Sequence, residues 1–424
     1  MKICILGLGY IGLPTSLLFA TSGHQVLGID INPKVVKSLN DGKLHFEEKG
    51  MQKLFEKTIK DKTFRASEKV EPSDVFIVCV QTPLDKSYNV SDLNYVKTAC
   101  EMVYPHLKKG NLVIIESTIS PGSSETLFRK VLEKSGLKVE QDFHLIHCPE
   151  RAIPGNTVFE MINNHRIVGG MSKKGLAKAK ELYQSFVPED KITLTDIRTA
   201  EIVKLMENTY RDLNIALANE FAMISEDLGI DVWDAIKLAN YHPRVNIHKP
   251  GPGVGGHCLA IDPWFLTEQS FNAQLIQQAR SVNDSMPTYT LLLTKKLLDS
   301  DAAFPTITIL GVAYKGNVDD ARETPALKFI HLAEKQGYLI KIHDPHVIEF
   351  HGRELLSLDE AVKDSDCIVV ITDHDAFKEI NPEKIGKMMK HKKVLDARNI
   401  LDHKSWEKAG FEIKVLGKNP NQLL

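Results

Sequence analysis

The sequence lacks several features that would place it in a specialised class. It has only six cysteines among 424 residues, and none forms a CxxC pair, so a zinc or redox motif is not expected. The formal net charge is −2, which gives no strong field for nucleic acid or an acidic membrane. No apolar run has the length of a membrane span, and the N-terminus lacks a signal-peptide pattern. These absences predict a cytoplasmic protein with no metal, nucleic-acid or membrane partner.

The first half of the chain alternates strand and helix signals. Its length exceeds what one ordinary core holds, so two or three domains are expected. Short apolar strands are predicted at residues 2–6, 25–29, 75–80, 112–116 and 143–147, with helices between them. This alternation is typical of a parallel, doubly wound sheet.

The pattern changes near residue 196. From there to about residue 229 the chain has no proline or glycine and its apolar residues recur at helical spacing, which predicts one long helix and a second beginning near Asp231. A loop rich in glycine and proline follows at 243–263. A further helix is expected at 275–300, with Pro287 kinking or interrupting it.

After Pro305 the strand–helix alternation returns and repeats the first half. Residues 23–30 (GHQVLGID) resemble residues 337–344 (GYLIKIHD), and Ser73-Asp74 resembles Ser365-Asp366. Chance similarity of short strands is the alternative. The predicted fold is α/β, with two Rossmann-like doubly wound domains joined by a long central helix and a helical region. The expected domains are 1–195, 196–300 and 301–424.

A glycine-rich turn follows the first strand. Gly7, Gly9 and Gly12 form a GxGxxG pattern around Tyr10 and Ile11, and Asp30 ends the next strand. Such glycines allow a tight turn and close approach of a pyrophosphate to a helix N-terminus, and the acid can bind a ribose hydroxyl. The sequence therefore predicts NAD rather than NADP. A glycine turn without a ligand is the alternative.

Two threonines follow predicted strands and point to the same cleft. Thr82 and Thr118 come just after buried strands, and ligands of open α/β sheets bind at the carboxyl ends of strands. Ordinary caps or turns are the alternative for both.

Cys258 lies in a glycine-rich loop with Asp262 four residues further on. A thiolate is a strong nucleophile, and the glycines let backbone approach a ligand closely. The loop alone is equally consistent with a buried thiol in a turn.

The long predicted helix carries a polar face. Lys204, Asn208 and Arg211 fall at i, i+4 and i+7, and Glu201 joins them. On a surface helix such a stripe is usually solvated. The other basic candidates are Arg151, Arg244, Lys315, Arg322 and Arg398, which mean little singly.

Taken together, these segments resemble the UDP-glucose/GDP-mannose dehydrogenase family over the whole chain. The shared motifs are the first glycine turn, Thr82-Pro83, Ser117-Thr118 with Pro121-Gly122, the Cys-Pro-Glu at 148–150, Lys204 with Asn208, the Gly-Gly-His-Cys at 255–258 with Asp262-Pro263, and the segments 313–316 and 320–323. The resemblance implies an N-terminal NAD domain, a central dimerisation region and a C-terminal domain for UDP. It also implies oxidation of a sugar C6 alcohol by two NAD⁺, through a thiohemiacetal and a thioester on Cys258.

The same resemblance assigns roles to the other residues. The implied catalytic residues, besides Cys258, are Lys204, Asn208, Asp262, Thr118 and Glu150. The implied NAD contacts are Gly7, Gly9, Tyr10, Ile11, Gly12, Asp30, Thr82, Thr118 and Arg322. The implied substrate contacts are Glu150, Arg151, Lys204, Asn208, Arg211, His242, Arg244, Gly255, Tyr314, Lys315 and Arg398. Arg244 resembles a residue that the neighbouring subunit donates, which implies a homodimer or a higher homo-oligomer.

Segments 147–156, 207–216, 242–247 and 263–265 resemble the branch that oxidises 2-acetamido sugars. They imply UDP-N-acetyl-D-mannosamine as substrate, with UDP-N-acetylglucosamine as the close alternative, and a product used for a surface polysaccharide. Two other functional classes are alternatives. A two-electron dehydrogenase of the 6-phosphogluconate or hydroxyisobutyrate type needs neither a nucleophilic cysteine nor a second Rossmann-like domain. A non-catalytic nucleotide-sugar-binding or NAD-binding regulator predicts loss of Cys258, Lys204 or Asp262, and all three are present.

Overall fold

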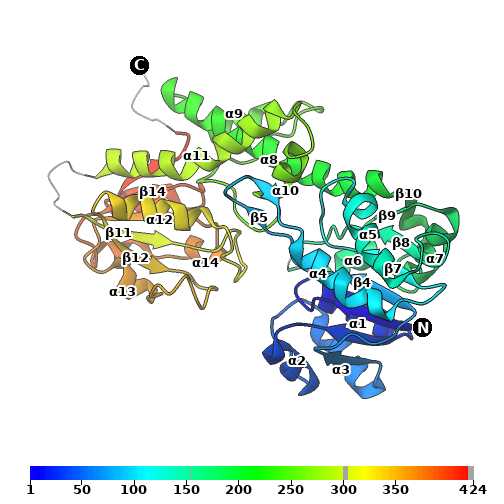
Figure 1. Cartoon of the computed structure of the whole chain (residues 1–424). Coiled ribbons are helices and arrows are strands. Elements are labelled where there is room, and N and C mark those ends of the chain that lie inside the picture. Colours follow the sequence, from blue (N-terminus) through cyan, green and yellow to red (C-terminus); the bar gives the residue numbers. More distant parts are fainter. Residues whose placement is uncertain (154, 299–303, 419–424) are drawn as a thin grey trace. The chain divides into compact units, whose positions relative to one another are not determined.

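The structure is a computed structural model that describes residues 1–153, 155–298 and 304–418 (Figure 1). Contacts divide the chain into two compact units. The first holds Met1–Glu207 and Trp264–Asn272, and the second holds Asn208–Pro263 and Ala273–Leu424. The predicted helical middle at 196–300 therefore contributes to both units. The boundary expected at 300/301 lies outside the described residues.

The first unit is built on an eight-stranded sheet with the strand order β10-β9-β8-β7-β4-β1-β2-β3. Its strands are β1 (Lys2–Leu6), β2 (Gln25–Ile29), β3 (Phe64–Ser67), β4 (Val75–Val78), β7 (Leu112–Ile115), β8 (His144–His147), β9 (Arg166–Gly170) and β10 (Ile192–Asp196). Its α-helices are α1 (Gly12–Thr21), α2 (Pro33–Asn40), α3 (Met51–Asp61), α4 (Asn94–Val103), α5 (Arg129–Leu132), α6 (Thr157–Asn163) and α7 (Lys173–Tyr183). A small hairpin joins β5 (Leu84–Asp85) to β6 (Val90–Ser91).

Both faces of this sheet are covered, as expected for a doubly wound fold. Along β1, Ile3 and Ile5 pack into one apolar cluster, and Cys4 and Leu6 pack into another on the opposite face. The alternation follows from the two-residue period of a strand. It explains why the run reads as continuously apolar in the sequence.

One pair of strands departs from the predicted all-parallel sheet. β8 and β9 are antiparallel, with Ile146 opposite Gly170 and His147 opposite Gly169. The chain leaves β8 and enters β9 from the same edge because the connection does not cross the sheet. Continuing this register places Arg166, the first residue of β9, opposite Glu150.

The second unit is built on a five-stranded parallel sheet with the strand order β12-β11-β13-β14-β15. Its strands are β11 (Thr306–Leu310), β12 (Leu339–His343), β13 (Cys367–Val370), β14 (Lys393–Asp396) and β15 (Glu412–Val415). Helices α12 (Pro325–Lys335), α13 (Leu358–Val362), α14 (Asp375–Lys378), α15 (Pro382–Gly386) and α16 (His403–Lys408) accompany them.

Equivalent hydrogen bonds confirm that the two sheets repeat one design. Asp74 accepts the N–H of Lys2, the first residue of β1, at 2.8 Å. Asp366 accepts the N–H of Thr306, the first residue of β11, at 2.7 Å. The short sequence repeat therefore reflects two Rossmann-like domains.

Two of the four central helices, α8 and α11, are long. Helix α8 runs from Ile197 to Asp227, close to the predicted bounds, and α9 (Val232–Ala239) follows with Asp231 as its N-cap. Helix α10 spans Asp262–Thr267. Helix α11 (Gln274–Leu297) continues through Pro287, so the proline does not interrupt it.

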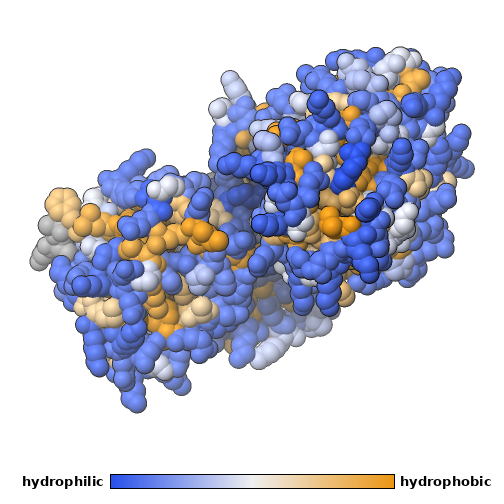
Figure 2. All heavy atoms as spheres, turned by 90° about the horizontal axis from the view of Figure 1, so that it is seen from below, coloured by the Kyte–Doolittle hydropathy of each residue, from blue (hydrophilic) through white to orange (hydrophobic). Residues whose placement is uncertain are grey.

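The face drawn in Figure 2 is mostly hydrophilic, with smaller apolar groups between the charged residues. No helix in the described part of the chain combines the length and the apolar character needed to cross a bilayer.

Candidate active site

The glycine turn after β1 has the geometry of a pyrophosphate cradle. Gly7 has φ +91°, and a Cβ on Gly12 would lie 1.8 Å from the carbonyl oxygen of Gly7, so both positions exclude side chains. A Cβ on Gly9 would meet no protein atom within 4 Å. The packing of the protein itself does not explain a glycine at position 9, whereas close approach of a bound pyrophosphate does. The turn opens α1, whose N-terminal amides favour a phosphate.

Asp30 lies beside this turn, at the end of β2. Its carboxylate accepts the N–H of Leu8 at 3.0 Å and the N–H of Asn32 at 2.8 Å. The residue is half-buried, and a carboxylate has further lone pairs that can accept a ribose hydroxyl. The residues present therefore fit an NAD adenosine ribose.

An aromatic wall that sequence reasoning missed borders the turn. The centroids of the Tyr10 and Phe46 rings are 4.5 Å apart. The His45 ring packs edge-on against Phe46, with 4.8 Å between the two centroids. Burial lowers the pKa of His45, although Asp30 and the Leu8 backbone oppose that shift. No glycine pattern or other motif marks residues 45 and 46, so sequence reasoning had no signal by which to find them.

The second Rossmann-like turn is closed to this role. Gly311 donates to the His343 carbonyl as Gly7 donates to Ile29, but the Asp344 carboxylate is buried. It accepts the N–H of Val312 at 2.7 Å and lies 3.1 Å from His374 Nε2. Gly311 and Gly316 match the first and third glycines of a GxGxxG pattern, but Ala313 stands where the pattern has its second glycine, the one that lets a pyrophosphate approach closely. The dinucleotide site is therefore in the first unit.

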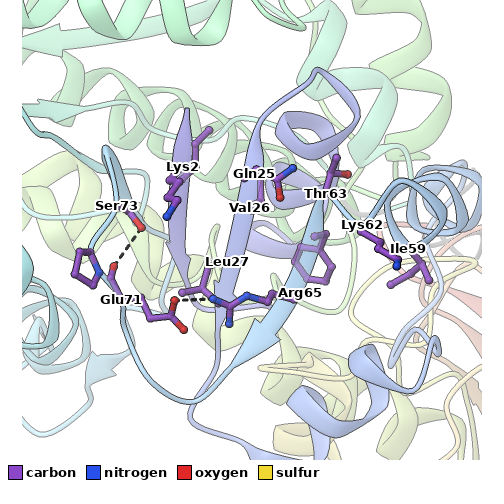
Figure 3. Close-up of a pocket in the computed structure, with 13 residues that line it drawn as sticks. Lys2, Gln25, Val26, Leu27, Ile59, Lys62, Thr63, Arg65, Glu71 and Ser73 are labelled. Atoms are coloured by element: carbon purple, nitrogen blue, oxygen red, sulfur yellow. Dashed lines mark hydrogen bonds and ion pairs between the residues drawn. The ribbon is translucent and has the colours of Figure 1, made fainter.

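A pocket of about 410 Å³ lies elsewhere on the first sheet (Figure 3). Lys2, Gln25 and Thr63 line it at the amino ends of β1, β2 and β3, and Arg65 pairs with Glu71 at 2.6 Å. Ligands of open α/β sheets bind at the carboxyl ends of the strands. We therefore do not assign this pocket to NAD.

The loops that carry Thr82 and Thr118 follow β4 and β7, at the carboxyl edge of the sheet. Thr82 is buried and Thr118 is partly buried. Between them, the Ser117 hydroxyl donates to the Val80 carbonyl at 2.7 Å, which fixes one loop to the other. The structure thus brings the two strand ends together.

Glu150 lies in a buried ionic cluster. Arg166 Nη2 is 2.8 Å from the Glu150 carboxylate, which also accepts the N–H groups of Arg151 at 2.6 Å and Ala152 at 2.8 Å. Burial alone would raise the pKa of Glu150, but Arg166 and the two amides outweigh it, so the pKa lies below its usual range. Glu150 is therefore a carboxylate at neutral pH.

Glu116 completes this cluster and is a residue that sequence reasoning did not single out. It accepts from Tyr183 Oη at 2.6 Å, and Arg166 Nη1 lies 3.6 Å away. Burial raises the pKa of Glu116 despite Arg166. The two carboxyls that share one guanidinium therefore have pKa values shifted in opposite directions.

Arg151 has its polar nitrogens engaged within the first unit. Nε donates to Glu207 at 3.0 Å, Nη2 is 2.5 Å from the other Glu207 oxygen, and Nη1 donates to the His165 carbonyl at 2.6 Å. In this arrangement all three guanidinium nitrogens of Arg151 contact oxygen atoms of the protein.

Helix α8 carries the predicted polar face, which is not a solvated stripe. Lys204 and Glu201 are buried, whereas Arg211 is exposed and close enough to His248 to help lower its pKa, after burial. Asn208 Nδ2 donates to Asp262 at 2.5 Å. Two predicted catalytic residues, 54 positions apart in sequence, therefore form a direct pair.

Cys258 is the only exposed cysteine of the six. Its carbonyl accepts the N–H of Asp262 at 2.8 Å and that of Ile261 at 3.0 Å, which makes a tight turn before α10. Burial raises the pKa of Cys148 to about 11 and that of Cys100 and Cys367 to about 12. Exposure therefore separates the Cys258 thiol from the buried thiols, and the same backbone turn joins its loop to the Asn208–Asp262 pair.

The glycines before Cys258 pack on loops of the second Rossmann-like domain. A Cβ on Gly255 would lie 2.7 Å from the Glu323 carbonyl oxygen, and one on Gly256 would lie 2.9 Å from the Tyr314 ring. Gly256 donates to the Arg322 carbonyl at 3.1 Å, and Arg322 itself pairs with Asp320. Tyr314 and Arg322 therefore lie at the cysteine loop.

Arg398 lies at the same loop, near Gly251. A Cβ on Gly251 would come 2.5 Å from Arg398 Nη1, and Arg398 Nη2 is 2.8 Å from Asp373.

Lys315 is exposed beside Tyr314. His242 and Arg244 lie together in the exposed segment 241–246, with 3.4 Å between Arg244 Nη2 and His242 Nε2. No group of three or more potential ligands suited to a metal ion occurs among the described residues.

Comparison with known proteins agrees with this geometry. Residues 1–187, 198–285 and 308–403 match the NAD-binding, central and UDP-binding domains of the UDP-glucose/GDP-mannose dehydrogenase family. A UDP-N-acetyl-D-mannosamine dehydrogenase of Methanococcus vannielii is 46% identical over 98% of this chain and 97% of its own length.

Solved structures give the same result. The structure of UDP-D-ManNAc dehydrogenase from Pyrococcus horikoshii matches with a TM-score of 0.93 and 42% identity, over 99% of this chain and 100% of that one. The UDP-N-acetyl-mannosamine dehydrogenase of Staphylococcus aureus matches with a TM-score of 0.89 and 41% identity over the full length of both chains. With an NAD cradle in the first unit and a cysteine loop on the second Rossmann-like domain, this chain belongs to the UDP-glucose/GDP-mannose dehydrogenase family and is an NAD-dependent UDP-sugar dehydrogenase.

Proposed function

We propose that the chain oxidises the C6 alcohol of UDP-N-acetyl-D-mannosamine to the carboxylate, UDP-N-acetyl-D-mannosaminuronate, with Cys258 as the covalent nucleophile. The observation that carries the chemistry is the exposed Cys258 whose carbonyl binds the N–H of Asp262, itself paired with Asn208. The sugar is proposed from full-length relatives that are named for UDP-N-acetyl-D-mannosamine. A nucleotide-linked uronic acid is an activated donor, so a glycosyltransferase building a surface polysaccharide is the class of enzyme that consumes it.

The chain's own residues divide the work between two oxidations. NAD⁺, when bound, accepts one hydride in each. An alcohol must lose its proton before it releases hydride, and Lys204 and Asn208, one helical turn apart, supply a cation and an amide donor to the developing oxyanion. The Cys258 thiolate then adds to the C6 aldehyde, giving a thiohemiacetal whose oxidation yields a thioester.

Hydrolysis of the thioester completes the reaction. Water adds to the thioester carbonyl, the C–S bond breaks, and the acid leaves with the Cys258 thiol restored. Asp262 and Thr118 are proposed to hold the water. Glu150, which Arg166 keeps ionised, is proposed to assist the proton transfer.

The substrate contacts are proposed to come from several loops. NAD is proposed to bind at the glycine turn with Tyr10, Ile11 and Asp30. Thr82, Thr118 and Arg322 are proposed as its further contacts. Gly255, Tyr314, Lys315 and Arg398 hold the nucleotide, and Arg211 and His242 reach the diphosphate and the acetamido group. The Arg151 side chain is proposed to contact protein groups and not the substrate, because its nitrogens already bind Glu207 and the His165 carbonyl.

A side-by-side assay tests the substrate. NADH formation is measured with UDP-N-acetylmannosamine, UDP-N-acetylglucosamine and UDP-glucose, and the expected result is preference for the first with two NADH per molecule consumed. Preference for UDP-N-acetylglucosamine would support the alternative within the family, since the two sugars differ only at C2. One NADH per product would exclude the four-electron reaction, and no turnover at all would favour a non-catalytic binding role.

Removing Asp30 should weaken NAD binding selectively. Hydrogen bonds to charged groups contribute about 1.5–3 kcal/mol, so we expect Asp30→Ala to raise the NAD Kd about ten- to hundredfold. The NAD Kd is measured by quenching of intrinsic fluorescence. Asp74→Ala is the control, because Asp74 makes a comparable bond to Lys2 at the amino end of the sheet. An unchanged Kd in Asp30→Ala would contradict the assignment.

We also propose that the chain works as a homodimer or a higher homo-oligomer through α8 and α9. Tyr210, Leu217 and Ile224 recur along α8 at intervals of seven residues and are exposed. Leu228, directly after α8, and Leu238 on α9 are exposed as well. Exposed apolar stripes of this kind are typical of helix pairing between subunits. The exposed segment with Arg244 follows α9 and is proposed to reach the partner's site.

A complementation experiment tests the shared site. Arg244→Ala and Cys258→Ala should each be inactive, because one lacks the donated arginine and the other lacks the nucleophile. In mixed dimers, one site combines an intact Cys258 with the partner's intact Arg244. Random mixing in a twofold-symmetric dimer should then restore activity to about a quarter of the sites. No recovery after subunit exchange, checked by native mass spectrometry, would contradict donation across the interface.

A further inference from the structure

We propose that the Arg151–Glu207 ion pair is a positioning pair that holds α8 at Lys204, and that the Arg151 side chain does not contact the substrate. The inference rests on the proposed function only in giving Lys204 a catalytic role. All the groups it uses belong to the first unit.

The first observation is how α8 is anchored before Lys204. The Glu201 carboxylate accepts the N–H of Gly122 at 2.5 Å and that of Ser124 at 3.0 Å. Gly122 belongs to the loop after β7 that carries Thr118, Ser124 begins the helical segment Ser124–Phe128 that follows this loop, and Glu201 is buried. One turn before Lys204, the helix is therefore bound to the loop after β7.

The second observation is how α8 is anchored after Lys204. Glu207 receives two parallel N–H groups from Arg151, with Nε–O at 3.0 Å and Nη2–O at 2.5 Å. Paired contacts of this kind fix orientation as well as distance. The side chains are only 26% and 35% exposed, so solvent screens the pair incompletely. Arg151 follows Glu150, so this anchor joins the helix to the loop after β8.

Lys204 lies three residues from each anchor. At 1.5 Å rise per residue, each anchor is about 4.5 Å from Lys204 along the helix axis. The helix is thus fixed on both sides of the lysine, to the Thr118 loop on one side and to the Glu150 loop on the other. A side chain that must meet a reacting oxygen needs such placement, because small displacements lower rates strongly.

The chain offers a matched control on the same helix. Arg198, on the first turn of α8, also forms an ion pair with a glutamate, Glu125, and Arg198 is 65% exposed. It binds α8 to the first unit but lies two turns before Lys204. If ion pairs on this helix served only stability, both pairs would behave alike.

The experiment is a double-mutant cycle on the full-length enzyme. Arg151→Gln, Glu207→Gln and the double variant are compared with the same three variants of Arg198 and Glu125. We expect each change in the first pair to lower kcat about tenfold or more, with the KM for the UDP-sugar and the Kd for NAD within about threefold of wild type. The double variant should be no slower than either single one. The Arg198–Glu125 set should keep wild-type kcat.

The split between kcat and KM decides the outcome. If Arg151 instead bound substrate, Arg151→Gln would raise KM while Glu207→Gln kept wild-type kcat, and that result would overturn the proposal. Additive losses of kcat in the double-mutant cycle would overturn it as well. Arg151→Lys keeps the charge without the paired geometry and should remain folded, so it must also lose kcat. A wild-type enzyme without turnover on any UDP-sugar would instead count against the proposed function, independently of this cycle.

Discussion

Cys258→Ser should lower steady-state formation of the acid by at least about a thousandfold, because removing a catalytic nucleophile usually costs this much or more. NAD binding should stay at the wild-type level, since the glycine turn and Asp30 belong to the other unit. At most one NADH should form per bound UDP-sugar in a single-turnover experiment. Stopped-flow NADH absorbance and mass spectrometry of the product measure both quantities.

Alkylation supplies the control for this variant. Cys258 is exposed, and the other five thiols are buried or partly buried. Iodoacetamide should therefore modify one site in the native wild type, with loss of activity, and none in native Cys258→Ser. After unfolding, the remaining five cysteines of the variant should all react. Two NADH per substrate at the wild-type rate in Cys258→Ser would rule out the covalent route.

The sequence predicted the architecture well because its main signals are local. Strand periodicity placed β1 and β2 at their observed bounds, and the long stretch without glycine or proline placed α8. The repeated Asp30 and Asp344 segments correctly indicated two related sheets. What periodicity does not contain is strand direction, so the antiparallel β9 was missed, and with it the place of Arg166 opposite Glu150.

The candidate site was only partly accessible to sequence reasoning. The glycine turn and the Gly-Gly-His-Cys segment are contiguous motifs, so they could be recognised directly. The Asn208–Asp262 and Arg151–Glu207 pairs join residues more than fifty positions apart, and nothing local to either residue marks its partner. Glu201 was placed on the correct helix face, but whether that face is solvated or buried depends on the loop after β7.

Replacing Arg166 with methionine is expected to destabilise the NAD-binding unit by about 3–5 kcal/mol, because it leaves two buried carboxyl groups without their shared cation. In the native protein the Arg166, Glu116 and Glu150 side chains are only 5%, 0% and 7% exposed. Differential scanning calorimetry at neutral pH measures the loss. Arg65→Met is the matched control, since Arg65 pairs with Glu71 at the surface and such pairs contribute about 1 kcal/mol or less.

The pH dependence of the loss separates this electrostatic cause from a simple packing defect. In the native protein, Glu150 has a lowered pKa, so its ionised form stabilises the fold at any pH above the unfolded pKa. This stabilisation is lost as the pH falls through the folded pKa. The raised pKa of Glu116 has the opposite effect, because it lowers the stability of the folded state as the pH rises above the unfolded pKa. Without Arg166, burial should raise the pKa of both groups, so the folded state binds more protons than the unfolded state.

The stability of Arg166→Met should therefore fall as the pH rises above the ordinary glutamate pKa of about 4.3, and the variant should approach wild type at acidic pH. Adding Glu116→Gln removes one of the two uncompensated carboxylates and keeps a side chain that can bond Tyr183, so it should recover part of the loss at neutral pH. A packing defect would give a loss that neither acid nor the second substitution relieves. That result would show that the cluster holds the Glu150 loop by shape and not by charge.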